Sequence, residues 1–123
     1  MWLLDTNALI YCRKFLKQKP FKKNYTYTTI FSLIEFPKAI YYKEILVYYP
    51  NAATYKESLT YALKLRKKGT PIPTIDILIG TIAIEKNIYL VTNDSDFQAL
   101  KAVEPRLIVT IPEDYLENIQ KIK

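Results

Sequence analysis

The sequence predicts an α/β fold with a parallel or mostly parallel sheet. In two places a short apolar stretch runs into a polar turn and then a helical pattern: WLL at residues 2–4, followed by a helix start at 5–7, and IYLV at residues 88–91, followed by a helix from Asp96. Alternating strands and helices favour parallel pairing, with the strand ends gathered at one edge, where ligands bind. The 123 residues and the 50% apolar composition fit one domain, residues 1–123, with a real core.

The first half of the chain is expected to supply two strands and two helices. After the strand at residues 2–4, Asp5 and its polar neighbours should cap a helix that continues to about Lys17. Residues 25–29 combine β-branched and aromatic side chains and should form a brief strand. A helix should begin near residue 30, with Pro37 in a first turn or at a kink.

The second half begins with an amphipathic helix at residues 51–68, which Gly69 should end. Its apolar positions include Ala53, Leu59, Ala62, Leu63 and Leu65. Thr74 is expected to cap the next helix, which is apolar over most of its surface and should be largely buried. The remaining elements are predicted as a strand at 88–91, a helix at 96–103, a strand at 106–111 and a final helix from Glu113.

The composition excludes several kinds of catalytic chemistry. The chain has no histidine, which excludes Ser–His hydrolysis, histidine-based cleavage of RNA and zinc sites built on imidazole. The single cysteine, Cys12, is expected to be a small buried helix residue, and the two isolated glycines form no phosphate-binding motif. If the protein is an enzyme, carboxylates must perform the chemistry.

The basic residues outnumber the acidic ones, 18 against 12, and ten of them lie in two clusters. The first cluster contains Arg13, Lys14, Lys17, Lys19, Lys22 and Lys23, and the second contains Lys64, Arg66, Lys67 and Lys68. Such patches attract polyanions, and eleven tyrosines offer rings on which bases could stack. Solvated helix faces explain the same clusters equally well.

Four of the acidic residues lie within or beside apolar stretches: Asp5, Glu35, Asp76 and Asp94. Asp5 and Asp94 follow predicted strands, so both should project at the same edge of the sheet. Asp76 falls in the first turn of its helix, where the partial positive charge of the helix end favours a carboxylate. Each residue alone has a structural explanation as a cap, a turn or a salt-bridge partner, but the set of four suggests a shared site.

Carboxylates that converge at one edge of a sheet repel one another. The repulsion is roughly 4 kcal/mol per pair at a separation of about 4 Å and an effective dielectric constant near 20. A cluster of this kind needs a cation, and a divalent ion of the Mg²⁺ or Mn²⁺ type fits a set of oxygen ligands best.

The segments LLDTNALI, SLIEF, PTIDILIGTIAIEKN and LVTNDSDF, in this order and spacing, resemble a PIN domain and more narrowly a VapC-type toxin ribonuclease. The resemblance extends over essentially the whole chain and rests on the ordered set of segments. It implies a three-layer α/β/α sandwich around a mostly parallel sheet. It also implies hydrolysis of RNA phosphodiester bonds with Mg²⁺ or Mn²⁺ held by three or four acids.

Carried over residue by residue, the resemblance assigns the catalytic and metal-binding roles to Asp5, Glu35, Asp76 and Asp94. Asp96 matches the auxiliary acid of the family. Thr6, Asn7 and Thr92 match polar supports that orient carboxylates or metal-bound water. The basic clusters would then bind the RNA backbone, through Arg13, Lys14, Lys17, Lys64, Arg66, Lys67 and Lys68.

The resemblance also implies partners: an RNA substrate, a small antitoxin that blocks the acidic pocket with a basic side chain, and a second copy in a homodimer. No stretch approaches the roughly 20 apolar residues of a membrane span and no signal sequence is present, so we expect a cytoplasmic location without membrane association. Two alternatives come from other classes. A non-catalytic RNA-binding or assembly module would not need all four acids, and a haloacid-dehalogenase-like phosphatase requires an aspartate where this chain has Asn7.

Overall fold

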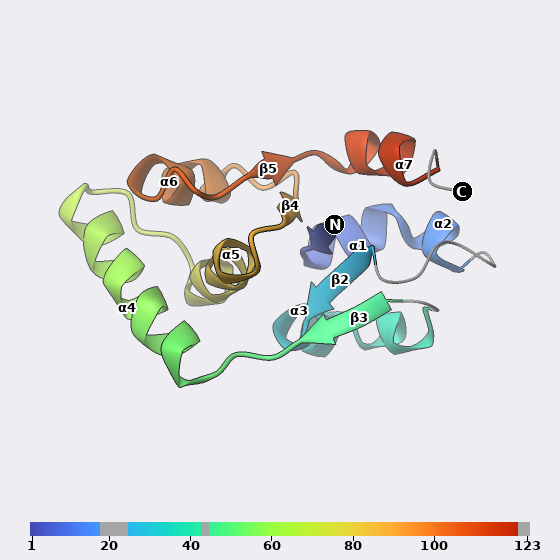
Figure 1. Cartoon of the computed structure of the whole chain (residues 1–123), viewed down its shortest axis with the longest axis horizontal. Helices are drawn as coiled ribbons and strands as arrows, with labels where there is room; N and C mark the ends of the chain where they lie inside the picture. The colour runs from blue at the N-terminus through green and yellow to red at the C-terminus, as the bar shows by residue number, and fades with distance from the viewer. Residues whose placement is uncertain (18–24, 43–44, 121–123) are drawn as a thin grey trace.

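A single sheet of parallel strands organises the chain (Figure 1). This computed structural model describes residues 1–17, 25–42 and 45–120. Over these residues the strands are β1 (Trp2–Leu4), β2 (Thr26–Thr29), β3 (Ile45–Tyr48), β4 (Tyr89–Val91) and β5 (Val109–Thr110). Their order is β3-β2-β1-β4-β5, and each neighbouring pair is parallel.

The register between β1 and β4 determines which residues meet beyond the strand ends. Leu3 pairs with Leu90 and Leu4 pairs with Val91, so Asp5 leaves β1 beside the end of β4. The backbone N–H of Asp5 donates to the carbonyl oxygen of Val91 at 3.2 Å, which extends the ladder by one step. The central strand therefore places its acid next to the turn that follows β4.

Helices cover both faces of the sheet, and Figure 1 shows them as two groups on either side of the strands. One group consists of α1 (Thr6–Tyr11), α2 (Arg13–Lys17) and α7 (Pro112–Gln120). The other consists of α4 (Ala52–Lys67), α5 (Thr74–Lys86) and α6 (Asp96–Val103). The short helix α3 (Ile30–Glu35) and the 3₁₀ helix η1 (Pro37–Tyr41) lie between β2 and β3 in the chain. This arrangement confirms the predicted three-layer sandwich.

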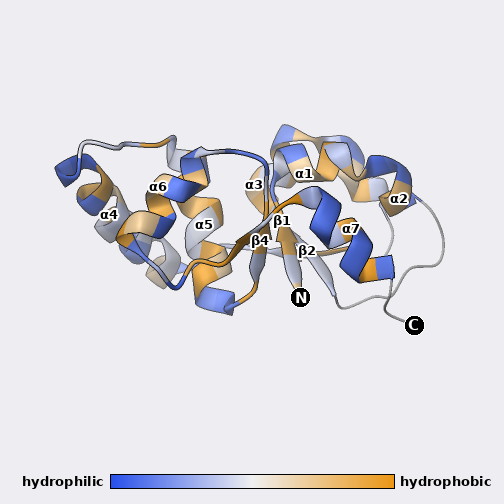
Figure 2. Ribbon diagram, turned by 90° about the horizontal axis from the view of Figure 1, so that it is seen from above, coloured by the Kyte–Doolittle hydropathy of each residue, from blue (hydrophilic) through white to orange (hydrophobic). Residues whose placement is uncertain are grey.

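Each face of the sheet has its own hydrophobic core, because successive side chains of a strand point in opposite directions. Leu3 and Leu90 pack into the core under α4, α5 and α6, whereas Leu4 and Val91 pack into the core under α1 and α7. All four side chains are fully buried, and each such burial contributes about 1.5–3 kcal/mol. Figure 2 shows the strands enclosed between the two layers of helices.

Helix α5 lies deepest in the first of these cores, as its apolar sequence predicts. Its residues from Ile77 to Ile84 are all buried. A Cβ atom added to Gly80 would lie 2.2 Å from the Cδ2 atom of Leu100 on α6. The glycine is therefore explained by close packing of the α6 side chain against α5.

The N-terminal helix differs from the prediction of one helix to about Lys17. The structure has two helices, because α1 ends at Tyr11 and α2 begins at Arg13. Cys12 is the C-cap of α1 and is buried at the junction, and its carbonyl oxygen still accepts from the backbone N–H of Leu16 at 3.0 Å. The helical direction is thus kept across a break in the regular hydrogen bonding.

The strand β3 was missed by the sequence analysis, and β5 is shorter than the predicted strand at 106–111. Both strands lie at the edges of the sheet and are only partly buried, so their sequences lack a clear buried pattern. The expected cap of α5 is also wrong. Pro73 occupies the N-cap position, and no side chain caps the helix.

The helix α4 buries a more polar face than its apolar residues predict. Thr54, Ser58, Tyr61 and Leu65 face inward, and the hydroxyl of Ser58 donates to Thr81 on α5 at 2.9 Å. Leu59 and Leu63 are 63% and 62% exposed. The apolar residues of α4 thus form an outward surface as well as part of the core. Among the described residues, no helix is long and apolar enough to span a membrane.

Candidate functional site

A cavity of about 320 Å³ lies where β1 and β4 end and α5 begins. It contains all four of the acids singled out from the sequence. Its lining is formed by Asp5, Thr6, Asn7, Glu35, Pro73, Ile75, Asp76, Ile79 and Asp94. Folding therefore brings together side chains from four separate segments of the chain.

Asp5 is the most buried acid of the cavity, with 5% of its surface exposed. It is the N-cap of α1, and its Oδ1 atom accepts from the backbone N–H of Ala8 at 2.8 Å. Its Oδ2 atom accepts from the hydroxyl of Thr92 at 2.5 Å. Burial raises the pKa of Asp5, and these two hydrogen bonds oppose that rise because they favour the charged carboxylate.

Glu35 reaches the cavity from the last turn of α3 and is exposed to solvent. Its Oε1 atom accepts from the hydroxyl of Thr6 at 2.6 Å, so the start of α1 holds the end of α3. The direction of α3 is set at its other end, where the side chain of Thr29 accepts from the backbone N–H of Ser32 at 3.2 Å. The helix ends before Pro37, which begins η1 and leaves Glu35 at the rim.

Asp76, Asp94 and Asp96 form the tightest group of acids, each offering a carboxylate oxygen within 4.8 Å of the others. The turn after β4 is held locally: the backbone N–H of Asp94 donates to the Thr92 hydroxyl, and that of Asp96 donates to Asp94 Oδ1, each at 2.9 Å. Burial, and to a lesser extent the charges of Asp94, Asp96 and Asp5, together raise the pKa of Asp76 to about 7. The raised pKa of Asp76 thus reflects its burial first and the repulsion within the group second.

The donor set of the cavity fits a hard divalent cation. Two charged carboxylates at 4.8 Å, the limit within which the oxygens of Asp76, Asp94 and Asp96 lie, would repel by roughly 3–4 kcal/mol at an effective dielectric constant near 20. Within residues 1–17, 25–42 and 45–120, no lysine or arginine lines the cavity and none of these acids takes part in an ion pair. Carboxylate and hydroxyl oxygens are the ligands that Mg²⁺ and Mn²⁺ prefer.

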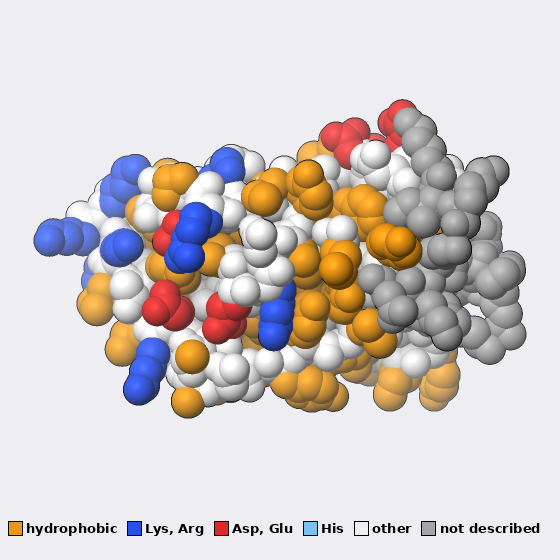
Figure 3. Space-filling model, viewed as in Figure 1, with side chains coloured by type: hydrophobic (Ala, Val, Ile, Leu, Met, Phe, Trp, Pro, Cys, Tyr) orange, Lys and Arg blue, Asp and Glu red, His pale blue; other side chains and the backbone are white. Residues whose placement is uncertain are grey.

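The predicted RNA-binding residues lie outside the cavity. Arg13, Lys14 and Lys17 are exposed on α2, and Lys64, Arg66, Lys67 and Lys68 are exposed at the C-terminal end of α4. Figure 3 shows lysine and arginine side chains gathered on the side of the molecule formed by α4. Lys19, Lys22 and Lys23 lie outside the described residues.

Some residues of the cavity were not singled out from the sequence. Pro73, Ile75 and Ile79 provide an apolar wall at the start of α5. Prolines precede this helix in the sequence, but nothing in their pattern indicates that Pro73 faces the acids. Its position follows from the packing of α5 against the sheet.

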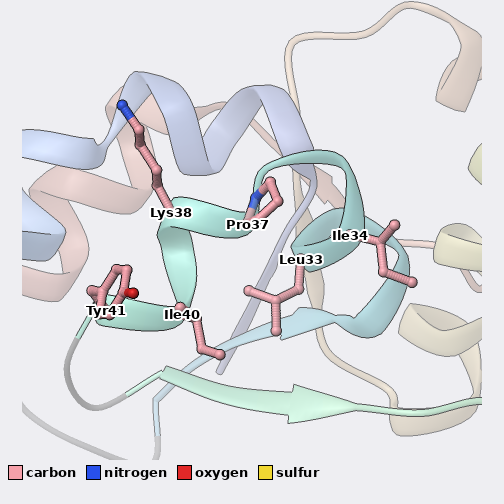
Figure 4. A pocket seen from close by; sticks show the side chains of 6 residues that line it. All are labelled: Leu33, Ile34, Pro37, Lys38, Ile40 and Tyr41. Carbon is pink, nitrogen blue, oxygen red and sulfur yellow. The ribbon is translucent and has the colours of Figure 1, made fainter.

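A second, larger cavity of about 520 Å³ lies next to α3 and is mostly apolar (Figure 4). We call it the apolar groove, and its lining consists of Leu33, Ile34, Pro37, Lys38, Ile40 and Tyr41. Ile34 and Ile40 are 68% and 67% exposed. Helix α3 thus borders both cavities, because Glu35 lines the acidic one and its neighbour Ile34 lines the groove.

Comparison with solved structures shows the fold. The chain is similar to VapBC from Salmonella typhimurium bound to DNA (TM-score 0.72, 18% identity, 90% of this chain and 97% of that one). It is also similar to VapBC-1 from nontypeable Haemophilus influenzae (0.70, 21%, 91% and 98%) and to VapBC2 from Rickettsia felis bound to a promoter DNA fragment (0.68, 20%, 89% and 97%). The matching chain is the VapC toxin, a PIN domain. No family model and no curated protein matches the chain.

Proposed function

We propose that the protein is an Mg²⁺- or Mn²⁺-dependent endoribonuclease of the PIN-domain type, acting as the toxin of a toxin-antitoxin pair. The observation that carries the proposal is the cavity in which Asp5, Glu35, Asp76 and Asp94 converge, with no lysine or arginine among the described residues that line it. The similarity in fold to the VapC chains of VapBC complexes supports it.

In the proposed mechanism, Asp5, Asp76 and Asp94 would hold the cation, and Glu35 would be a further ligand or the base. A bound divalent cation would lower the pKa of a water molecule and stabilise charge on the scissile phosphate. The threonine bond to Asp5 keeps that carboxylate in place, and the bond from Thr6 holds Glu35 at the rim, where substrate would arrive. Attack by water in line with the leaving oxygen leaves 5′-phosphate and 3′-hydroxyl ends.

The proposed substrate is RNA, and the basic residues of α2 and the end of α4 would bind its backbone. The net charge of +6 attracts polyanions such as RNA to the protein, even though the proposed catalytic cavity is acidic. The basic end of α4 precedes the connector to Pro73, which lines the cavity. We place the reaction in the cytoplasm.

The proposed protein partner is an antitoxin that covers the apolar groove and extends a basic side chain to the acidic cavity. Ile34 and Ile40 offer apolar contact area beside Glu35, so a single segment could contact both cavities. We also propose a homodimer, for which the exposed Leu59 and Leu63 of α4 offer a surface. Replacing both leucines with lysine should convert the dimer to a monomer in light scattering.

The proposal is tested by incubating the full chain with cellular RNA after removal of metal with EDTA, and again after adding Mg²⁺ or Mn²⁺. We expect no cleavage without metal, restored cleavage with either ion, and products with 5′-phosphate ends. Cleavage that persists in EDTA, or 2′,3′-cyclic phosphate ends, would contradict the mechanism. Binding of RNA without cleavage under any condition would favour the alternative of a non-catalytic RNA-binding module.

A further inference from the structure

We propose that a cavity formed by lysine and tyrosine side chains, separate from the acidic cavity, binds one nucleotide of single-stranded RNA. Tyr41 stacks on the base, and Lys17 and Lys38 bind the phosphate. The inference rests on the proposed function, because RNA is the substrate named there. It adds a contact to a base, which the basic clusters alone do not provide.

This lysine–tyrosine cavity has a volume of about 380 Å³ and lies where the end of α2 meets η1. The described residues that line it are Lys17, Lys38, Tyr41 and Tyr42. Its volume falls within the range of about 300–1,000 Å³ that is typical of small-ligand pockets. No acid is among these residues, so the two lysines give the cavity a positive charge, in contrast to the acidic cavity.

The type of helix explains why Lys38 and Tyr41 share the cavity. A 3₁₀ helix has about three residues per turn, so side chains three positions apart lie on the same face. Lys38 and Tyr41 have this spacing in η1, and Figure 4 shows both at the end of the apolar groove away from Ile34. Lys17 is the last residue of α2, so a second element of the fold brings the other positive charge.

Three of these side chains are available to a ligand. Tyr41 is 82% exposed, which leaves its ring open to a base. Lys17 and Lys38 are exposed as well, and within residues 1–17, 25–42 and 45–120 neither takes part in an ion pair. Their charges are therefore not neutralised by an acid in the described part of the chain and can interact with a phosphate.

Tyr42 is the buried member of the cavity, with 6% of its surface exposed. Its ring packs edge-to-face against Phe36, with the ring centroids 6.2 Å apart. Its hydroxyl is buried but has no hydrogen-bond partner among the described residues. A buried hydroxyl without a partner is rare and costly, and an acceptor such as a phosphate oxygen in this cavity would supply the missing partner.

An open ring beside two cations favours single-stranded RNA over a protein segment as the ligand. Proteins bind single strands by stacking unpaired bases on aromatic rings and by contacting the phosphates with basic side chains. The lysine–tyrosine cavity shares Lys38 and Tyr41 with the apolar groove, and Ile34 of that groove is the neighbour of Glu35 in the acidic cavity. A strand bound here can therefore continue along α3 toward the acidic cavity.

The test is the fluorescence anisotropy of a labelled oligoadenylate RNA, titrated with the full-length chain in EDTA at several salt concentrations. EDTA prevents cleavage, so only binding is measured. Tyr41→Ala should weaken binding by about 5- to 150-fold, the usual contribution of one stacked base, and Tyr41→Phe should bind as wild type does. Tyr49→Ala is the matched control, because Tyr49 is 65% exposed and does not line this cavity, and it should also bind as wild type does.

The lysines should change the salt dependence of binding. Lys17→Gln and Lys38→Gln should each reduce the slope of log affinity against log salt concentration by about 0.7, the value for one contact to a phosphate of a single strand. Lys56→Gln removes the same charge from an exposed position on α4 and should leave the slope unchanged. Thermal unfolding measured in parallel should be the same for all variants, because the replaced side chains are exposed.

Wild-type affinity of Tyr41→Ala together with a wild-type salt slope of Lys38→Gln would overturn the inference and leave this cavity to a protein partner. Equal losses in Tyr49→Ala and Lys56→Gln would overturn it as well, because binding would then depend only on overall charge and exposed rings. Cleavage of the same RNA by the wild type in Mg²⁺ tests the proposed function separately, so the two failures can be distinguished.

Discussion

The two cavities that border α3 are built in different ways. The acidic cavity takes its side chains from the end of β1, the end of α3, the start of α5 and the turn after β4. The described residues that line the apolar groove all come from the single segment 33–41. The first therefore depends on the register of the sheet and the packing of distant elements, whereas the second depends on the local path of the chain around Pro37.

The two cavities also differ in the chemistry of the side chains that line them. The acidic cavity holds carboxylates within 4.8 Å of one another, and none of the described residues in its lining is basic, so it could hold a cation. The apolar groove exposes Ile34 and Ile40 to water, so it offers an apolar surface instead. We therefore expect that ion binding and partner binding can be separated by mutation, even though α3 contributes residues to both cavities.

The largest effect is expected from Asp94→Asn, which removes a charge from the acidic cavity. RNA cleavage should fall by roughly 10²- to 10⁴-fold, the range in which a positioned catalytic group contributes. The measurement is the initial rate of cleavage in Mg²⁺. Asp114→Asn is the matched control, because this exposed acid lies in the first turn of α7, and it should cleave as wild type does.

The second effect concerns stability. A cation that binds only the folded chain should raise the free energy of unfolding, by about 2.7 kcal/mol when its concentration is a hundred times the dissociation constant. Urea unfolding with and without Mn²⁺ measures the difference. Asp94→Asn should lose most of the gain and Ile40→Asp should keep it. An equal gain in both variants would mean that the ion binds elsewhere.

The third effect concerns the groove. Ile40→Asp places a charge among apolar side chains and removes about 1.5–3 kcal/mol of apolar contact with a partner that covers it. Inhibition of cleavage by a cognate antitoxin should weaken by roughly tenfold or more, since about 1.4 kcal/mol corresponds to a factor of ten. Cleavage without the antitoxin should stay at the wild-type rate. Full inhibition of this variant would show that the groove is not the contact surface.

The smallest effect is a change in pH dependence. The pKa of Asp76 is raised to about 7 in the folded chain, so the folded state binds more protons than the unfolded state between about pH 4 and 7. The stability of the metal-free protein should therefore fall as pH rises through this window. Asp76→Asn should flatten that part of the curve and be more stable than wild type above pH 7. The measurement is the thermal unfolding of both proteins in EDTA between about pH 4 and 7, and equal pH dependence of wild type and Asp76→Asn would contradict the prediction.

The sequence predicts those helices and strands whose buried side chains follow a regular apolar pattern. β1, β4, α5 and α6 were predicted within a residue or two, and the four acids that line the cavity were selected because each lies beside an apolar stretch. β3 escaped detection because an edge strand is only partly buried. The apolar residues of α4 did not predict that Thr54 and Ser58 would be buried on the side that faces the core. The hydrogen bond between the hydroxyls of Ser58 and Thr81 produces no periodic apolar pattern in the sequence.

The hydrogen bonds between the site residues and the apolar wall of the cavity could not be predicted from the sequence, because they depend on tertiary contacts. The bond from Thr92 to Asp5 joins residues 87 positions apart, and it exists only because β1 and β4 are neighbours in register. The apolar wall from Pro73 to Ile79 depends in the same way on where α5 packs. Sequence patterns indicate which residues are available, and tertiary contacts decide which of them meet.

The most direct measurement is anomalous X-ray diffraction from crystals of the full chain grown in Mn²⁺. We expect an anomalous peak in the acidic cavity, within coordination distance of carboxylate oxygens from Asp5, Asp76 or Asp94. A cavity without a peak at saturating Mn²⁺, with these side chains turned toward separate lysines and arginines, would contradict it.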